Sequence, residues 1–184
     1  MAEFAHLHLH TDYSLLDGVC EIERLMAHIT GLGQHSVAMT DHGNIYGAVH
    51  FFEAARRHDI HPILGCKLYV CQNEDHRAEP RRDDHHHLLV FVKNEKGYRN
   101  LVRITSEASL HGFYRKPRIS KRYLAEHARG LIGLSGCLAG ELCEHLMATD
   151  YDQARRTAAQ YQDIFGRGNF YLEMLILASL MRNR

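Results

Sequence analysis

The sequence lacks tryptophan, has only three prolines, and carries no excess of either charge. Lysine and arginine together number 22, and so do aspartate and glutamate, so no net field draws the chain to nucleic acid or to an acidic membrane. The apolar stretch from Leu175 to Met181 is far shorter than the roughly 20 residues of a membrane helix. We therefore expect no membrane partner, and any contact with DNA to be local or made through a neighbouring domain.

Closely spaced cysteine pairs are also missing. The chain has five cysteines, and an odd number without any C-x-x-C argues against both a disulfide framework and a zinc ribbon. We expect a reducing compartment, the cytoplasm. The sequence contains no G-x-x-x-x-G-K-[ST], G-x-G-x-x-G or G-x-S-x-G, so the common phosphate-binding and hydrolase motifs are excluded. The cysteines are Cys20, Cys66, Cys71, Cys137 and Cys143.

The 184 residues are enough for one domain with a real core, at 45% hydrophobic and 24% charged residues. Short apolar runs alternate with helical patterns, which predicts an α/β fold with a parallel sheet covered by helices. The runs predicted as buried strands are 36–40, 63–70, 88–92, 131–135 and 170–174.

Four helices are predicted. Three have apolar residues at helical spacing, namely Ile22, Leu25, Met26 and Ile29 in the first, Ala48, Phe51, Phe52 and Ala55 in the second, and Leu101, Ile104 and Ala108 in the third. The fourth begins with a cap at Asp150 and ends before Gly166. The charged stretch 73–86 and the basic and aromatic stretch 112–117 are predicted as surface loops.

Two histidines near the start form the first candidate site. In an extended segment, residues two apart point the same way, so His8 and His10 would present both imidazoles to one side. Imidazole is a common metal ligand, and Ser14 and Asp17 follow close behind. The alternative is an ordinary half-buried strand, in which histidines alternate with leucines only because polar groups face outward.

Further candidates follow predicted strands. In α/β folds with parallel strands, functional groups gather at the carboxyl ends of the strands. Asp41 and His42 follow the strand at 36–40, and Cys137 lies in a glycine-rich turn after 131–135. His87 lies at the edge of 88–92. Each of these residues also has a purely structural alternative. Asp and Gly suit turns, and a lone cysteine is usually a small buried hydrophobe. His87 is also compatible with a loop.

Taken together, these side chains gather at the ends of successive strands. Imidazoles with oxygen donors suit a cluster of Zn, Mn or Fe ions. Such clusters hydrolyse phosphate esters by making a metal-bound hydroxide and by clamping the entering and leaving oxygens. The residues alone therefore suggest a multinuclear phosphoesterase site.

Several longer segments resemble one known family. They run in order from Phe4 to about Met174, and the chain is similar in them to the PHP (polymerase and histidinol phosphatase) domain of the bacterial DNA polymerase III alpha subunit. SLLDG, TDHGN, GYRNLV and LSGCLAGE are typical of this polymerase branch rather than of free-standing histidinol phosphatases. The matching segments are FAHLHLHTDYSLLDG, AMTDHGNIYGAVHFF, HPILGCKLYV, HLLVFVKNEKGYRNLVRI, GFYRKPRI and GLIGLSGCLAGEL.

The resemblance implies a PHP-type distorted (βα) barrel, with up to three divalent metal ions at one end. The ligands that it implies here are His8, His10, Asp17, His42, His87 and Cys137. Asp41 is a candidate catalytic residue beside them. In family members with a full ligand set, this site can act as a metal-dependent 3′–5′ exonuclease, whereas in others it is degraded and the domain supports the polymerase.

Two departures from the family pattern stand out. A carboxylate usually follows Gly-x in the third strand, but this chain reads Gly65-Cys66-Lys67, and a lysine cannot bridge two cations. The final Asp-x-His motif is also absent. We therefore expect a PHP domain over 1–174 that is incomplete at its C-terminus, followed by an atypical tail at 175–184, and doubtful occupancy by Zn, Mn or Fe.

The resemblance leaves two roles open for the chain, an active nuclease or phosphoesterase and a metal-poor scaffold, and the departures favour the scaffold. The chain cannot polymerise DNA alone, because the family's polymerase site lies in a later domain. The partners implied are the polymerase core, other replicase subunits and, through the parent protein, DNA. A stand-alone phosphatase of the histidinol-phosphatase type is the alternative.

Overall fold

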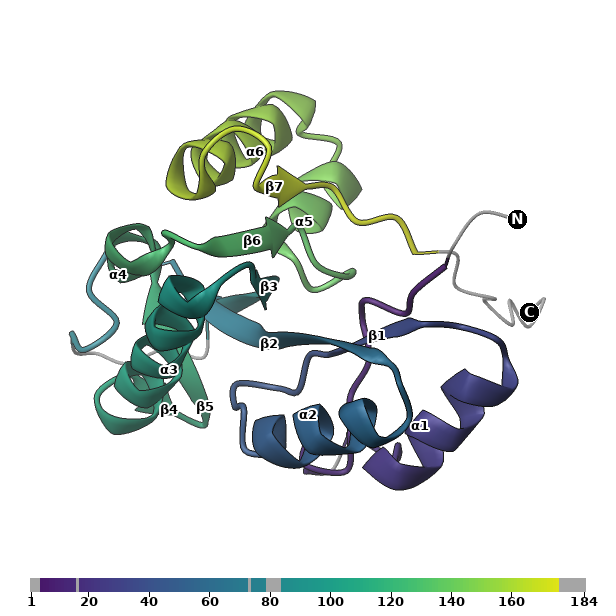
Figure 1. The fold of residues 1–184 in the computed structure, drawn as a ribbon. Coiled ribbons are helices and arrows are strands. Elements are labelled where there is room, and N and C mark those ends of the chain that lie inside the picture. Colours follow the sequence, from purple (N-terminus) through teal and green to yellow (C-terminus); the bar gives the residue numbers. More distant parts are fainter. Residues whose placement is uncertain (1–3, 16, 73, 79–83, 176–184) are drawn as a thin grey trace, which may run out of the picture.

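The computed structural model describes residues 4–15, 17–72, 74–78 and 84–175, and Figure 1 shows their arrangement. Within this part of the chain, a seven-stranded sheet carries six helices. The strands are β1 (Ser36–Met39), β2 (His61–Cys71), β3 (His85–Val92), β4 (Phe113–Tyr114), β5 (Lys116–Ser120), β6 (Leu131–Leu134) and β7 (Phe170–Tyr171). The helices are α1 (Ile22–Gly31), α2 (Ala48–Arg57), α3 (Glu95–Leu110), α4 (Lys121–His127), α5 (Glu141–Met147) and α6 (Tyr151–Phe165).

The α/β class is confirmed, but one strand direction differs from the prediction. The sheet follows the order β4-β5-β2-β3-β6-β7, with β1 also paired to β2. The pairs β1–β2, β2–β5 and β6–β7 are parallel, whereas β3 is antiparallel to both of its neighbours, β2 and β6. Of the predicted strands, β3 therefore departs from a parallel sheet, and the short β4, which was not predicted as a strand, is antiparallel to β5.

The four predicted helices are confirmed as α1, α2, α3 and α6. In α1 all four predicted apolar residues are buried. In α2 the prediction was wrong for Phe52, which is 42% exposed, while Ala54 is buried in its place. The Asp150 side chain accepts a hydrogen bond from the backbone N–H of Gln153, and Gly166 with φ of 83° ends the helix.

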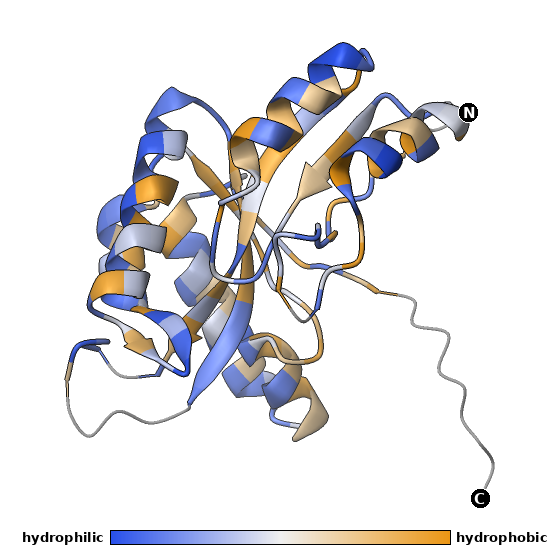
Figure 2. Cartoon of the chain, turned by 90° about the horizontal axis from the view of Figure 1, so that it is seen from below, coloured by the Kyte–Doolittle hydropathy of each residue, from blue (hydrophilic) through white to orange (hydrophobic). Residues whose placement is uncertain are grey.

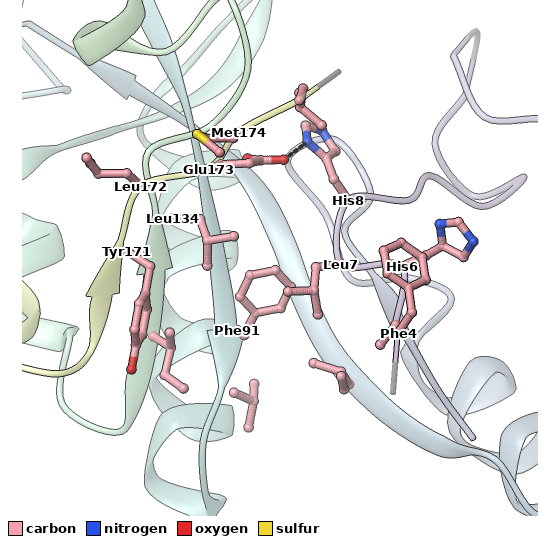
Figure 3. Close-up of a pocket in the computed structure, with 15 residues that line it drawn as sticks. Phe4, His6, Leu7, His8, Phe91, Leu134, Tyr171, Leu172, Glu173 and Met174 are labelled. Atoms are coloured by element: carbon pink, nitrogen blue, oxygen red, sulfur yellow. Dashed lines mark hydrogen bonds and ion pairs between the residues drawn. The ribbon is translucent and has the colours of Figure 1, made fainter. Parts of the chain in front are cut away.

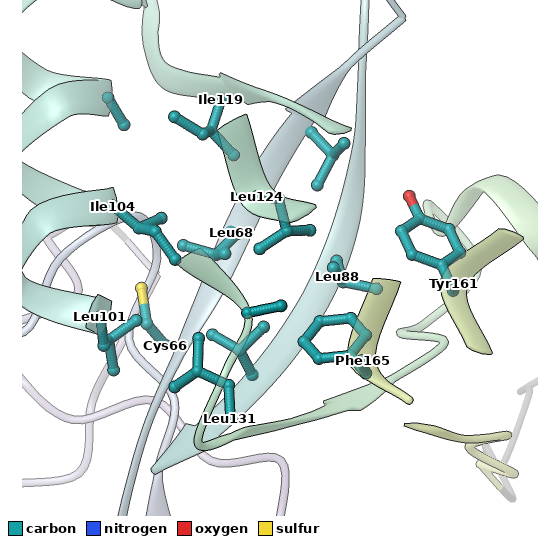
Figure 4. Packing of buried hydrophobic residues seen from close by; sticks show 14 residues of the cluster. Cys66, Leu68, Leu88, Leu101, Ile104, Ile119, Leu124, Leu131, Tyr161 and Phe165 are labelled. Atoms are coloured by element: carbon teal, nitrogen blue, oxygen red, sulfur yellow. The ribbon is translucent and has the colours of Figure 1, made fainter. Parts of the chain in front are cut away.

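Two apolar cores connect these helices to the sheet. One lies under α3, α4 and α6, where Leu101 and Ile104 lie beside Leu68, and Leu88 lies beside Phe165 (Figure 4). The other joins α1 and α2 to β1 around Phe51. Polar residues occupy the outer faces of the helices (Figure 2), as the amphipathic patterns predict. No helix in the described residues is long and apolar enough to span a bilayer.

Both predicted loops contain regular structure. The strand β3 begins at His85, and His86 is buried, so the end of the stretch 73–86 is not a solvated loop. The stretch 112–117 turns at Arg115, which has φ of 58°, and joins β4 to β5 in a hairpin. Residues 79–83 and most of the predicted tail, 176–184, lie outside the described residues.

Candidate functional site

The strand directions bring the predicted ligands to one end of the sheet. The N-terminal segment pairs in parallel with β1 through a bridge between His6 and Val37, so it runs with β1, β2, β6 and β7. The carboxyl ends of all these strands lie on the same side. Because β3 is antiparallel, its first residues are there too, which explains how His87 joins the site from the start of its strand.

Four imidazoles form a continuous group at this end. The ring centroids of His8 and His10 are 5.2 Å apart, and those of His10 and His42 are 4.3 Å apart. The ring of His87 follows at 5.5 Å from that of His42. The four rings thus come from the N-terminal segment, the loop after β1 and β3, which are far apart in the sequence.

A carboxylate and a thiol extend the group. Oδ2 of Asp17 lies 2.6 Å from Nε2 of His42, and the Asp17 side chain is 60% exposed, so it stands at the solvent side. Sγ of Cys137 lies 3.5 Å from Nδ1 of His87. All six predicted ligands are therefore linked by direct contacts or neighbouring rings. Whether they bind a metal stays a prediction.

Hydrogen-bond partners fix the tautomers of two rings. Nδ1 of His10 donates to the backbone carbonyl of Thr40 at 2.7 Å, so the lone pair of the neutral ring is on Nε2. In His42, Nε2 faces the acceptor Asp17, so Nδ1 accepts from the Tyr69 hydroxyl at 2.8 Å. Burial, followed by the charge of Asp17, raises the pKa of Tyr69 to about 12, which keeps this hydroxyl a donor.

Lys67 stands inside this group. It is buried, with 5% exposure, on β2, and its Nζ lies 3.4 Å from the free Nε2 of His10. Burial and then the Lys67 charge lower the pKa of His10 to about 4 and that of His42 to about 4. The same two causes lower the pKa of His87 to about 3. The three rings are thus neutral at pH 7.

The donors present do not fit a multinuclear metal cluster. The His10 atom that would bind an ion, Nε2, already faces the ammonium of Lys67. One ring nitrogen of His42 is turned toward Asp17 and the other toward Tyr69. In the residues that the structure describes, no three His, Cys, Asp or Glu side chains are grouped as one ion would require.

Asp41, the candidate catalytic residue, is buried and hydrogen-bonded to the N-terminal segment. It is fully buried, and its two carboxylate oxygens accept hydrogen bonds from the backbone N–H and the hydroxyl of Thr11, at 2.6 and 2.7 Å. Burial raises the pKa of its carboxyl, and the bonds to Thr11 oppose that rise. These contacts hold the N-terminal segment to the end of β1.

Glu173 is a site residue that sequence reasoning missed. Its Oε1 lies 2.7 Å from Nδ1 of His8 (Figure 3), and its side chain is 8% exposed. It lies two residues after β7, which ends at Tyr171. The predicted strand 170–174 included it, so the rule that pointed to Asp41 and His42, polar residues after a parallel strand, did not find it. A carboxylate in this position orients the His8 ring.

The sequence matches proteins of one family. The PHP domain pattern matches residues 6–175. DNA polymerase III subunit alpha of Helicobacter pylori (strain J99) is 44% identical over 94% of this chain and 15% of its own length. The protein of the same name from Treponema pallidum is 43% identical over 93% of this chain, and that from Thermus aquaticus is 40% identical over 94%. The chain spans about 15% of the length of these relatives.

Two solved structures are also similar. A protein from Bifidobacterium adolescentis, described as a metal-dependent phosphoesterase, has 18% identity and a TM-score of 0.40 over 91% of this chain and 57% of its own. An amidohydrolase from Chromobacterium violaceum has 18% identity and a TM-score of 0.42 over 83% of this chain and 43% of its own. With the pattern matched across nearly all of its described residues, the chain belongs to the PHP domain family.

Proposed function

We propose that this chain is the PHP domain of a DNA polymerase III alpha-type protein, and that it supports the polymerase core instead of hydrolysing phosphate esters. The first part is supported by relatives at 36–44% identity that carry this name. The second part depends on one observation, the buried Lys67 ammonium 3.4 Å from Nε2 of His10.

Electrostatics supports the scaffold role. Two like unit charges 4 Å apart repel by about 4 kcal/mol at an effective dielectric constant of about 20, and a divalent ion doubles that figure. An ion bound by His10 would lie close to the ammonium of Lys67 and would meet this repulsion. The usual compensation, a bridging carboxylate, is the group that Lys67 replaces.

The site residues then have a structural task. Lys67 on β2 contacts His10 of the N-terminal segment, and Asp17 contacts His42 after β1. Glu173 after β7 contacts His8. Each contact connects a different pair of chain segments at the same end of the sheet. These three contacts therefore hold the segments together without a metal ion.

In this role the domain works through its parent protein. Its partners would be the polymerase core and other subunits of a bacterial replicase in the cytoplasm, and it would meet DNA only as part of that assembly. Polymerisation would be carried out by other parts of the parent protein. The 15% of the relatives' length that the chain spans is consistent with one domain of such a protein.

The proposal is tested by assaying the purified 184-residue chain with Mn²⁺ or Zn²⁺ on bis(p-nitrophenyl) phosphate, on histidinol phosphate and on 3′-labelled single-stranded DNA. His42→Ala is the control, because it removes a central ring. We expect the wild type and His42→Ala to be equally inactive. Metal-dependent turnover that His42→Ala abolishes would overturn the scaffold role, and turnover of histidinol phosphate alone would favour a stand-alone phosphatase.

A further inference from the structure

Two hollows lie between α2 and α3, two helices that both pack on β2 (Figure 1). The first, of about 400 Å³, lies between the start of α2 and Tyr98 on α3. The second, of about 330 Å³, lies between the loop that precedes α2 and the part of α3 from Val102 onward. Because Tyr98 and Val102 are one helical turn apart, the two hollows lie end to end, and we call them together the α2–α3 groove.

Large apolar side chains are exposed along this groove. Tyr46 is 74% exposed, Val49 65% and Leu110 75%. Among the described residues that line the two hollows, only Glu53 and Arg56 are charged. Single apolar residues on a surface are ordinary, but a group of them beside a hollow is typical of an interaction site. The other exposed apolar residues that line the groove are Phe52, Tyr98 and Val102.

The outer face of α6 is different. Apart from Tyr151 at its start and Ala159, its exposed residues are polar or charged, namely Asp152, Arg155, Arg156, Gln160, Gln162 and Asp163. Such a face is typical of a helix that has only water on its outer side. The apolar residues that α2 and α3 turn outward therefore indicate a contact that α6 does not make.

The dimensions of the groove suit one helix. From Tyr98 to Leu110, α3 extends about 18 Å at about 1.5 Å per residue. A partner helix of about three turns, laid along this length, would place its residues i, i+3 or i+4 and i+7 in the groove, as amphipathic helices do in apolar grooves. Because the groove is almost uncharged, the side of that helix in contact with it must be apolar.

We propose that the α2–α3 groove is the surface by which this domain docks on its parent protein, and that an amphipathic helix of the polymerase core occupies it. The inference rests on the proposed function and adds the place of contact. The chain spans about 15% of the length of its relatives, so most of such a protein lies outside these residues and can supply the helix. Burial of the apolar side chains is favourable by about 25 cal/mol for each Å².

The test places the whole 184-residue chain in full-length DNA polymerase III subunit alpha of Helicobacter pylori (strain J99), in exchange for the segment to which it is 44% identical. Hydrogen exchange with mass spectrometry then compares the free chain with the chimera. We expect exchange at least about tenfold slower in the chimera at residues 43–52 and 98–110, and unchanged at 151–163. Primer extension by the chimera checks that the rest of that protein is folded.

Two groove variants and one control complete the experiment. In the chimera, Val49→Asp and Leu110→Asp should each abolish the added protection, because a carboxylate would enter an apolar contact. Both positions are highly exposed, so the free chain should stay folded, which circular dichroism checks. Tyr151→Asp is the matched control, since Tyr151 is 66% exposed at the start of α6, where an aspartate suits the helix N-terminus. It should leave the protection of the groove unchanged.

The other outcomes contradict the inference in different ways. Protection of another face, with the groove unchanged, would overturn the groove as the docking surface but would leave the scaffold role intact. Protection of no face would contradict the scaffold role as well. Groove protection in the free chain that grows with its concentration would identify a second copy as the occupant and would overturn the inference.

Discussion

Nζ of Lys67 lies 3.4 Å from Nε2 of His10, the ring nitrogen left without a proton by the bond from Nδ1 to the Thr40 carbonyl. The lysine therefore donates to the lone pair that a metal ion would otherwise take. Burial lowers the pKa of His10, His42 and His87 most, and the charge of Lys67 lowers it further. The same ammonium opposes a metal ion at Nε2 of His10. A positive charge is still present at the centre of the site, but a side chain supplies it.

Replacing Lys67 should change how the histidines titrate. In Lys67→Met, we expect the pKa values of His10 and His42, now about 4, and of His87, now about 3, to rise. They should remain below 6.5, because burial is the larger cause of the shift and the methionine preserves it. NMR titration of the histidine ring protons measures this directly.

Lys116→Met is the matched control for this titration. Lys116 is exposed and is the weakest of the causes that lower the pKa of His42. Its replacement should barely move the pKa of that ring. Equal titration curves for the wild type and Lys67→Met would contradict the role given to the ammonium of Lys67.

Glu107 on α3 should be important for stability in a pH-dependent way. Burial acts to raise its pKa, but hydrogen bonds from Arg77, His76 and His111 outweigh burial and lower the pKa to about 2. Glu107→Gln should lower the free energy of unfolding by about 2 kcal/mol at pH 7, since bonds to a charged acceptor are lost. Urea denaturation measures the difference.

The pH dependence of Glu107→Gln follows from the direction of the shift. A carboxyl with a lowered pKa stabilises the folded state above its unfolded pKa of about 4.5, and this contribution is lost as the pH falls toward 2. The difference in free energy of unfolding between the wild type and Glu107→Gln should therefore become smaller as the pH falls from about 4.5 toward 2. Glu126→Gln, at an exposed position on α4, should stay within about 0.5 kcal/mol of the wild type throughout.

Two glycines in helices should respond in opposite ways to alanine. A Cβ added to Gly97 in α3 would lie 1.8 Å from the carbonyl oxygen of Gly130, so Gly97→Ala should destabilise the fold by about 3 kcal/mol. A Cβ on Gly31 in α1 would meet no atom within 4 Å, so Gly31→Ala should stabilise it by about 0.5 kcal/mol. Thermal unfolding of both variants checks the pair, and a similar effect of the two substitutions would contradict this account.

Local patterns in the sequence were sufficient for most helices and strands. The spacing of Ile22, Leu25, Met26 and Ile29 predicts α1 because a helix of 3.6 residues per turn buries one face. The short helices α4 and α5 were missed, since each has seven residues and buries a single leucine, Leu124 or Leu142. A segment with one buried apolar side chain has no period to detect.

Strand direction could not be predicted in the same way. The run at 88–92 is apolar throughout, and a strand buried on both faces has the same pattern whether its neighbours are parallel or antiparallel. The antiparallel β3 nevertheless decides that His87 faces the site from the start of its strand. The pairing of β3 with β2 and β6 depends on the whole sheet, which no local pattern describes.

The sequence predicted which histidines form the group, but it did not predict the contacts that they make. His8 and His10 were found by their spacing of two residues, and His42 because it follows a predicted strand. The partner of His8, Glu173, is 165 residues away in the sequence, so no spacing connects them. Lys67 was recognised as a departure from the family pattern, but only the structure gives its distance to His10.

The most direct test is the number of metal ions bound by the 184-residue chain and by Lys67→Glu, after dialysis against Zn²⁺ or Mn²⁺ and then against metal-free buffer. Lys67→Glu replaces the ammonium with a carboxylate among the same imidazoles, and Lys67→Met separates loss of charge from gain of a ligand. Elemental analysis should find less than one ion per wild-type chain and at least one per Lys67→Glu chain. Two or more ions per wild-type chain would contradict the claim that the charge of Lys67 has taken the place of the metal.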